Sequence, residues 1–182
     1  MTEGLQQKIL TTWLRAIRQL LSDNSVTIIF AEQPGPRPEK PYISLKLLAG
    51  PSPLGSFDDF RRDETTQNRF VISGMRQYTL NIQVFGPDSL AIVDQVQTLM
   101  DSPNIFPLLR NDDVDLAVVE RGGVDDISEL LDTGYEARVS MDVVFNAAVN
   151  VVVDPGTIES VEWSGEIENG DTIEVSGTVP EA

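Results

Sequence analysis

Three pairs of adjacent acidic residues are the groups in this sequence best suited to bind a metal ion. They are Asp58-Asp59, Asp112-Asp113 and Asp125-Asp126. Carboxylate oxygens are the ligands that Mg²⁺ and Ca²⁺ prefer. Adjacent residues in a strand point to opposite faces of the sheet, so such a pair chelates poorly there. Because 29 of the 182 residues are acidic, pairs also arise by chance. We interpret them as solvated charge, with a carboxylate-dependent, metal-binding hydrolase as the alternative.

Two further segments have part of a ligand-binding pattern. Residues 125–129 offer oxygen ligands but lack the glycine and the closing glutamate of a calcium-binding EF-hand loop, so we predict that they begin a short helix. Residues 50–55 have glycines at both ends but no Gly-Lys-Ser/Thr ending, which excludes a phosphate-binding loop. We therefore predict no metal and no cofactor.

The sequence contains neither histidine nor cysteine. This removes the commonest general base at neutral pH, every catalytic triad that includes histidine, the thiolate nucleophile and the cysteine-based zinc site. An enzyme using carboxylates, lysine or tyrosine remains conceivable, but the composition favours a protein without catalytic activity.

The chain is strongly acidic, with a formal net charge of −16 at pH 7. Its 13 Lys and Arg residues are scattered, whereas a surface that binds phosphates needs them clustered. Arg61 and Arg62 are adjacent, but Asp58, Asp59 and Asp63 flank them and weaken any attraction for DNA. We expect these two arginines to lie in a loop and to form ion pairs with a neighbouring subunit.

No apolar run approaches the roughly 20 residues that span a bilayer. The first ten residues also lack the pattern of a signal peptide. We therefore expect a protein made and kept in a cytoplasm, with no membrane contact.

The spacing of apolar residues predicts an α+β fold. Apolar residues recur every three to four positions over residues 5–21, which predicts an amphipathic helix, and Asp88 or Ser89 can cap a second helix running to about Met100. The predicted strands cover residues 26–30, 42–49, 69–73, 78–85, 113–121 and 135–145, with loops at 33–41 and 57–68. Two helices against mainly antiparallel strands form a two-layer sandwich.

Residues 154–182, here called the C-terminal arm, differ in character from the core predicted for residues 1–153. The arm has eight Asp and Glu residues and no Lys or Arg. Residues 157–167 and 171–179 predict a β-hairpin, with a three-residue loop ending in Gly170. That loop pairs Trp163 with Val175, Ile173 with Gly165 and Val161 with Gly177, whereas a two-residue Asn-Gly loop would set apolar residues opposite polar ones.

The apolar face of this hairpin consists of Val161, Trp163, Ile173 and Val175. An isolated two-stranded hairpin is marginally stable in water, so this face needs a partner. The partner is either the core of the same subunit or a neighbouring subunit.

Three segments of the chain resemble a known family. They are RFVISGMRQYTLNIQVFGPDS (69–89), GYEARVSMDVVFNAAV (134–149) and GTIESVEWSGEI (156–167). Over residues 25–168 the sequence resembles the bacteriophage neck or tail-terminator (head–tail joining) proteins, while residues 170–182 have no place in the family pattern. The resemblance rests on the pattern of residues in the predicted strands and not on a catalytic signature.

The resemblance implies a virion structural protein, assembled in the host cytoplasm. It implies a ring, expected to be a hexamer, which caps the tail tube, contacts the tube or sheath and joins the tail to the head connector. DNA would pass through the lumen without specific binding, and an acidic lumen keeps the duplex from adhering. The alternatives are another neck, tail-tube or connector adaptor component, and a binding module of a host cell.

Overall fold

The computed structural model describes residues 4–21, 26–62, 69–111, 114–131, 134–154, 160–166 and 172–178. The chain divides into two compact units, one formed by Met1–Asp58 with Ser73–Asn150 and the other by Asp59–Ile72 with Val151–Ala182. The division predicted from the sequence, a core of residues 1–153 and an arm of residues 154–182, is a different division and stays a prediction.

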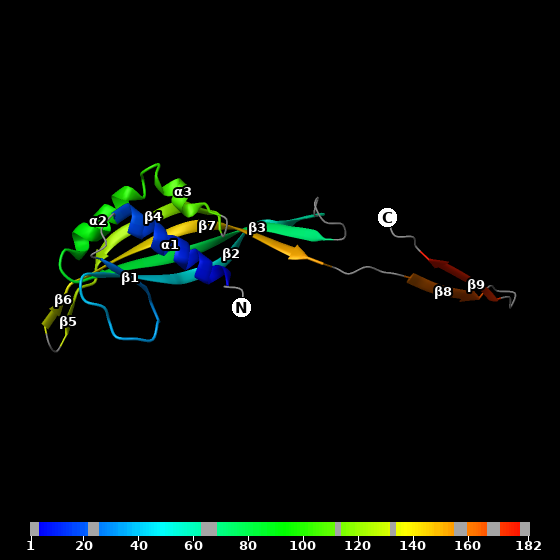
Figure 1. The fold of residues 1–182 in the computed structure, drawn as a ribbon, viewed down its shortest axis with the longest axis horizontal. Helices are drawn as coiled ribbons and strands as arrows, with labels where there is room; N and C mark the ends of the chain where they lie inside the picture. Colours follow the sequence, from blue (N-terminus) through cyan, green and yellow to red (C-terminus); the bar gives the residue numbers. More distant parts are fainter. Residues whose placement is uncertain are drawn as a thin grey trace. The chain divides into compact units, whose positions relative to one another are not determined.

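A five-stranded sheet organises the fold (Figure 1). Its strands are β1 (Thr27–Phe30), β2 (Tyr42–Arg62), β3 (Phe70–Phe85), β4 (Leu116–Asp126) and β7 (Arg138–Val153), in the order β1-β2-β3-β7-β4. Strand β1 pairs with β2 in parallel, and β4 pairs with β7 antiparallel. The predicted α+β class with a mainly antiparallel sheet is confirmed.

Helices cover one face of this sheet (Figure 1). They are α1 (Leu5–Leu21), α2 (Ser89–Leu99) and the five-residue α3 (Ile105–Leu109), where two helices were predicted. Helix α1 buries the predicted stripe, including Ile9, Trp13 and Ile17, against the sheet. Asp88 holds the predicted cap position of α2 but makes no side-chain capping hydrogen bond. No helix within the described residues is long and apolar enough to cross a membrane.

The loop predicted at residues 57–68 is wrong as far as Arg62, because β2 continues to that residue; residues 63–68 lie outside the described part of the chain. A paired ribbon can be polar on both faces, so its residues do not show the alternation used to find strands. The two strands predicted at 69–73 and 78–85 are one strand, β3. Gly74 interrupts the sequence pattern but lies inside β3, where a Cβ would come within 2.7 Å of the Arg76 side chain.

The short helix predicted from residue 125 is also wrong. Strand β4 ends at Asp126, and a small hairpin follows, made of β5 (Glu129–Leu131) and β6 (Gly134–Glu136). The Ser128 backbone N–H donates to Asp126 Oδ1 at 2.9 Å, which closes a local side-chain turn. This turn competes with the helical geometry that the sequence indicated.

The C-terminal arm contains the predicted hairpin, with β8 (Ser160–Glu166) antiparallel to β9 (Thr172–Thr178). The register pairs Trp163 with Val175, Gly165 with Ile173 and Val161 with Gly177, which confirms the predicted pairing. The three loop residues assumed in that prediction lie outside the described residues.

Candidate assembly surface

The sheet face opposite the helices is polar. On β7, the buried residues on the helix side alternate with half-buried residues on the other side, here called the open face. The open-face residues of β7 are Arg138, Ser140, Asp142, Val144 and Asn146. Period-two alternation thus gives one strand an apolar side and a polar side.

Side-chain hydrogen bonds connect β3 to β7 across the open face. Asn81, only 5% exposed, donates through Nδ2 to Ser140 Oγ at 2.7 Å and to Asp142 Oδ1 at 2.6 Å. These contacts satisfy a polar group that would be costly to bury alone. The open face is therefore ordered by the chain itself.

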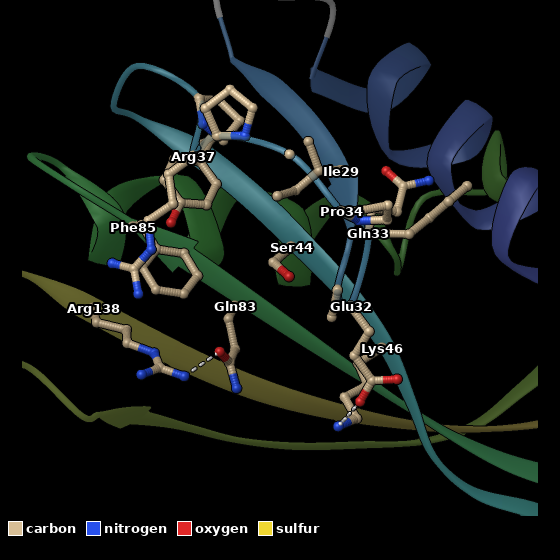
Figure 2. Close-up of a pocket in the computed structure, with 16 residues that line it drawn as sticks. Ile29, Glu32, Gln33, Pro34, Arg37, Ser44, Lys46, Gln83, Phe85 and Arg138 are labelled. Atoms are coloured by element: carbon tan, nitrogen blue, oxygen red, sulfur yellow. Dashed lines mark hydrogen bonds and ion pairs between the residues drawn. The ribbon is translucent and has the colours of Figure 1, made fainter.

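A pocket of about 470 Å³ lies at the end of the open face where β7 begins (Figure 2). Residues 31–38, most of which belong to the proline-rich segment 33–41, form one wall, and strands β1, β2, β3 and β7 supply the rest. In Figure 2, Ser44 and Gln83 lie in the middle of the view, with Phe85 and Arg138 on the left and Gln33 and Lys46 on the right. The Lys46 ammonium and Glu32 Oε1, 2.5 Å apart, form an ion pair at its rim.

The Arg138 side chain is held in this pocket by a hydrogen bond and by an aromatic ring. Its Nη2 donates to Gln83 Oε1 at 2.5 Å, and its guanidinium carbon lies 4.8 Å from the centre of the Phe85 ring. Phe85 in turn stacks on Tyr42 with ring centres 4.6 Å apart. Among the described residues Arg138 forms no ion pair, and its buried Nε has no acceptor. Its positive charge is thus held in a fixed orientation; among the described residues no carboxylate forms an ion pair with it, although it interacts at longer range with Glu136 and helps to lower the pKa of that carboxyl.

Glu136 fastens the proline-rich segment to the start of β7. Its carboxylate lies 2.5 Å from Lys40 Nζ and 3.5 Å from an Arg37 Nη atom, and its side chain is 8% exposed. The hydrogen bond from Lys40 is the main reason that the pKa of Glu136 is lowered, while burial opposes the shift. Gly86 permits this approach, because a Cβ there would lie 2.7 Å from Lys40 Cβ and its φ is +105°.

The β5–β6 hairpin presents an exposed apolar pair. Leu130 and Tyr135 are cross-strand partners, and they are 79% and 68% exposed. In the second unit, Phe60 is also exposed, at 60%, and stacks on Phe70 with ring centres 4.8 Å apart. These side chains are apolar surface that the described part of the chain leaves uncovered.

The residues predicted to form subunit contacts have different outcomes. Arg61 and Arg62 are exposed as expected, but they lie in strand β2 and not in a loop. Strands β8 and β9 place the backbones of Val161, Trp163, Ile173 and Val175 in the predicted register. The side chains of these four residues lie outside the description, so their role at an interface stays a prediction.

The acidic pairs do not converge on a metal site in the residues that the structure describes. Asp58 forms a bidentate ion pair with Arg76, which lowers the pKa of the Asp58 carboxyl mainly through the hydrogen bond. Asp126 accepts hydrogen bonds from Ser128, and these lower its pKa. Asp112 and Asp113 lie outside the described residues, within which no group of three ligating side chains occurs.

Sequence reasoning missed the pocket because its walls come from segments far apart in the chain. Only two signals pointed toward it. One is the stiffness of the proline-rich segment at residues 33–41, and the other is that Arg138 is the last basic residue of the sequence. Neither signal places the two together, since their proximity depends on the order of strands in the sheet.

Comparison with known proteins now identifies the class to which this arrangement belongs. No curated protein matches the chain. A family model described as phage neck terminator protein matches residues 7–171, well over half of the sequence. The chain belongs to the phage neck terminator protein family and is a structural component of the phage neck.

Proposed function

We propose that this protein is a ring-forming tail terminator, with six copies in the ring. The ring caps the tail tube, ends its polymerisation and joins it to the head connector. Its further contacts are with the neighbouring tube or sheath proteins. The membership of the neck terminator family supports this role.

The observation that carries the proposal is the exposed pair Leu130 and Tyr135 on a two-stranded hairpin outside the main sheet. A hairpin of this size is marginally stable alone, and burying an apolar side chain of this kind stabilises by about 1.5–3 kcal/mol. Contact with a neighbouring subunit would supply that stabilisation. Scattered single apolar side chains need no such explanation, but an adjacent pair on a projecting element does.

The hairpin of the C-terminal arm supplies a second set of contacts in this proposal, through Val161, Trp163, Ile173 and Val175. Arg61 and Arg62 form ion pairs with acidic residues of the next subunit. The net charge of −16 suits a lumen through which DNA moves without adhering. The ring needs no catalytic group for any of these tasks.

The proposal is tested by mass photometry and negative-stain electron microscopy of the purified protein. We expect rings of about six subunits, and we expect the double variant L130S/Y135S to lose them while its circular dichroism spectrum is unchanged. Leu90→Ser is the control, because Leu90 is 61% exposed but lies on helix α2 and not on the β5–β6 hairpin.

Virions provide the decisive version of the test, because the proposed ring acts at the end of the tail. Electron microscopy of particles lacking the protein should show tails of uncontrolled length that are not joined to heads. Tails of normal length joined to heads in those particles would refute the proposal.

A further inference from the structure

We infer that the pocket on the open face receives the acidic face of the β8–β9 hairpin of a second copy of this chain. This inference rests on the proposed function, because it assumes neighbouring copies. It goes further by naming the surface of one subunit, the pocket, and the segment of the next subunit, the β8–β9 hairpin, that contact each other.

The pocket is unusually basic for this protein. Arg37, Lys46 and Arg138 line it, and Glu32 is the only acidic residue among the lining residues. Lys40 lies beside them; both Lys40 and Arg37 form ion pairs with Glu136, and the charge of Arg138 also acts on this carboxylate. In a chain with a net charge of −16, a surplus of positive charge at one hollow favours an acidic partner.

Arg138 is the basic side chain of the pocket whose orientation is fixed by its neighbours. Its guanidinium is held by the neutral oxygen of Gln83 and by the ring of Phe85, and among the described residues it has no ion-pair partner. A guanidinium is a planar fork that matches a carboxylate, and charge-assisted bonds of this kind are about twice as strong as neutral ones. The group that completes the pocket is therefore a carboxylate.

The C-terminal arm carries carboxylates in the matching pattern. The register pairs Glu162 with Ser176, Ser164 with Glu174 and Glu166 with Thr172, which assigns positions 162, 166 and 174 to one face of the hairpin. The arm contains no Lys or Arg to oppose this contact. The opposite face then remains available for the apolar contacts proposed above.

The length of the chain favours a second copy as the source. Arg138 and Asn150 both belong to the first unit and to strand β7, where a rise of about 3.3 Å per residue puts them roughly 40 Å apart. The twelve residues from Asn150 to Glu162 span at most about 40 Å when fully extended. A subunit could bring Glu162 back to its own pocket only at the limit of extension and Glu166, sixteen residues from Asn150, only by using most of a reach of roughly 53 Å, whereas a neighbour is not constrained in this way.

The test uses the full chain with the photo-crosslinking residue p-benzoylphenylalanine in place of Gln33, an exposed residue that lines the pocket. Equal amounts of ¹⁴N-labelled and ¹⁵N-labelled protein are mixed before the rings assemble, so that each ring contains both labels, and are then illuminated, digested and analysed by mass spectrometry. We expect crosslinks from residue 33 to peptides within residues 157–182, with about half of them joining heavy to light chains.

Other crosslinking results overturn the inference. Crosslinks that never join heavy to light chains would show that the arm folds onto its own subunit. Crosslinks to other segments would show a different occupant, and no crosslinks in samples that contain rings would show that the arm does not occupy the pocket. Rings seen by microscopy without the expected crosslinks would refute this inference alone, while crosslinks without rings would refute only the proposed ring.

A charge exchange provides an independent measurement. Lys46→Glu should raise the dissociation constant between subunits roughly fivefold, as expected for a partly exposed ion pair. Adding Glu174→Lys in the same chain should restore it. Arg15→Glu, an equal charge change on the exposed side of α1, is the control and should leave the constant within about twofold. Failure of Glu174→Lys and of the analogous changes at positions 162 and 166 to restore association would overturn the pairing.

Discussion

The two faces of the five-stranded sheet are stabilised by different physical means. The helix-covered face is apolar and fully buried; the β7 residues Val143, Phe145 and Ala147 are each 0% exposed. The open face is polar, and hydrogen bonds such as those of Asn81 hold β3 to β7. The first face completes the fold of the subunit, while the second is ordered in advance and left available. The comparison shows that one sheet is stabilised by apolar burial on one face and by side-chain hydrogen bonds on the other.

The largest expected effect lies on the helix-covered face, at Trp13. This side chain is 0% exposed and meets Phe145 edge to face with ring centres 5.5 Å apart. Trp13→Ala should lower the free energy of unfolding by about 3–5 kcal/mol, because it removes buried apolar surface and leaves a cavity. Urea denaturation followed by circular dichroism measures this loss.

Trp13→Phe is the matched control for that experiment. The buried Trp13 Nε1 has no hydrogen-bond partner among the described residues, so phenylalanine removes an unsatisfied donor as well as some volume. The loss should therefore be smaller than for alanine. Equal losses of unfolding free energy for the two variants would mean that the apolar volume at position 13 does not set the stability. The helix-covered face would then not be stabilised mainly by packing.

The two faces also differ in how far the sequence predicts them. The α1 stripe with Trp13 was predicted correctly, because burial on one side of a helix imposes a periodic pattern on the sequence. The hairpin register at Trp163 and Val175 was predicted for the same kind of reason. The extension of β2 to Arg62 was missed, because a solvated ribbon selects no apolar alternation. The surroundings of Arg138 were missed, because they depend on which strands become neighbours.

The second prediction concerns the open face. Asn81→Ala removes both donors to Ser140 and Asp142 and leaves those acceptors without Asn81, so the free energy of unfolding should fall by about 1–3 kcal/mol. Thermal and urea denaturation give the value. Gln77→Ala, which removes one longer bond of 3.4 Å to Asn146, should cost about 1 kcal/mol or less. A loss for Asn81→Ala as large as that of Trp13→Ala would contradict the division of roles between the faces.

The smallest effect concerns Glu136 at the edge of the pocket, and it depends on pH. Because the pKa of Glu136 is lowered below its ordinary value of 4.5, its contribution to stability is present above about pH 4.5 and is lost as the pH falls through the folded-state pKa. Glutamine at position 136 can still accept from Lys40 but carries no charge. The difference in unfolding free energy between wild type and Glu136→Gln should therefore be on the order of 1 kcal/mol at pH 7 and shrink in acid.

Urea denaturation of both proteins at a series of pH values from 7 to below 4 measures this difference. Glu39→Gln, which removes the same charge from the same proline-rich segment without touching the contact between Lys40 and Glu136, controls for net charge. It should leave the unfolding free energy at pH 7 nearly unchanged. A difference for Glu136→Gln that grows on acidification would reverse the sign required by a lowered pKa, and the pocket would then be held in place by something other than the Glu136 carboxylate.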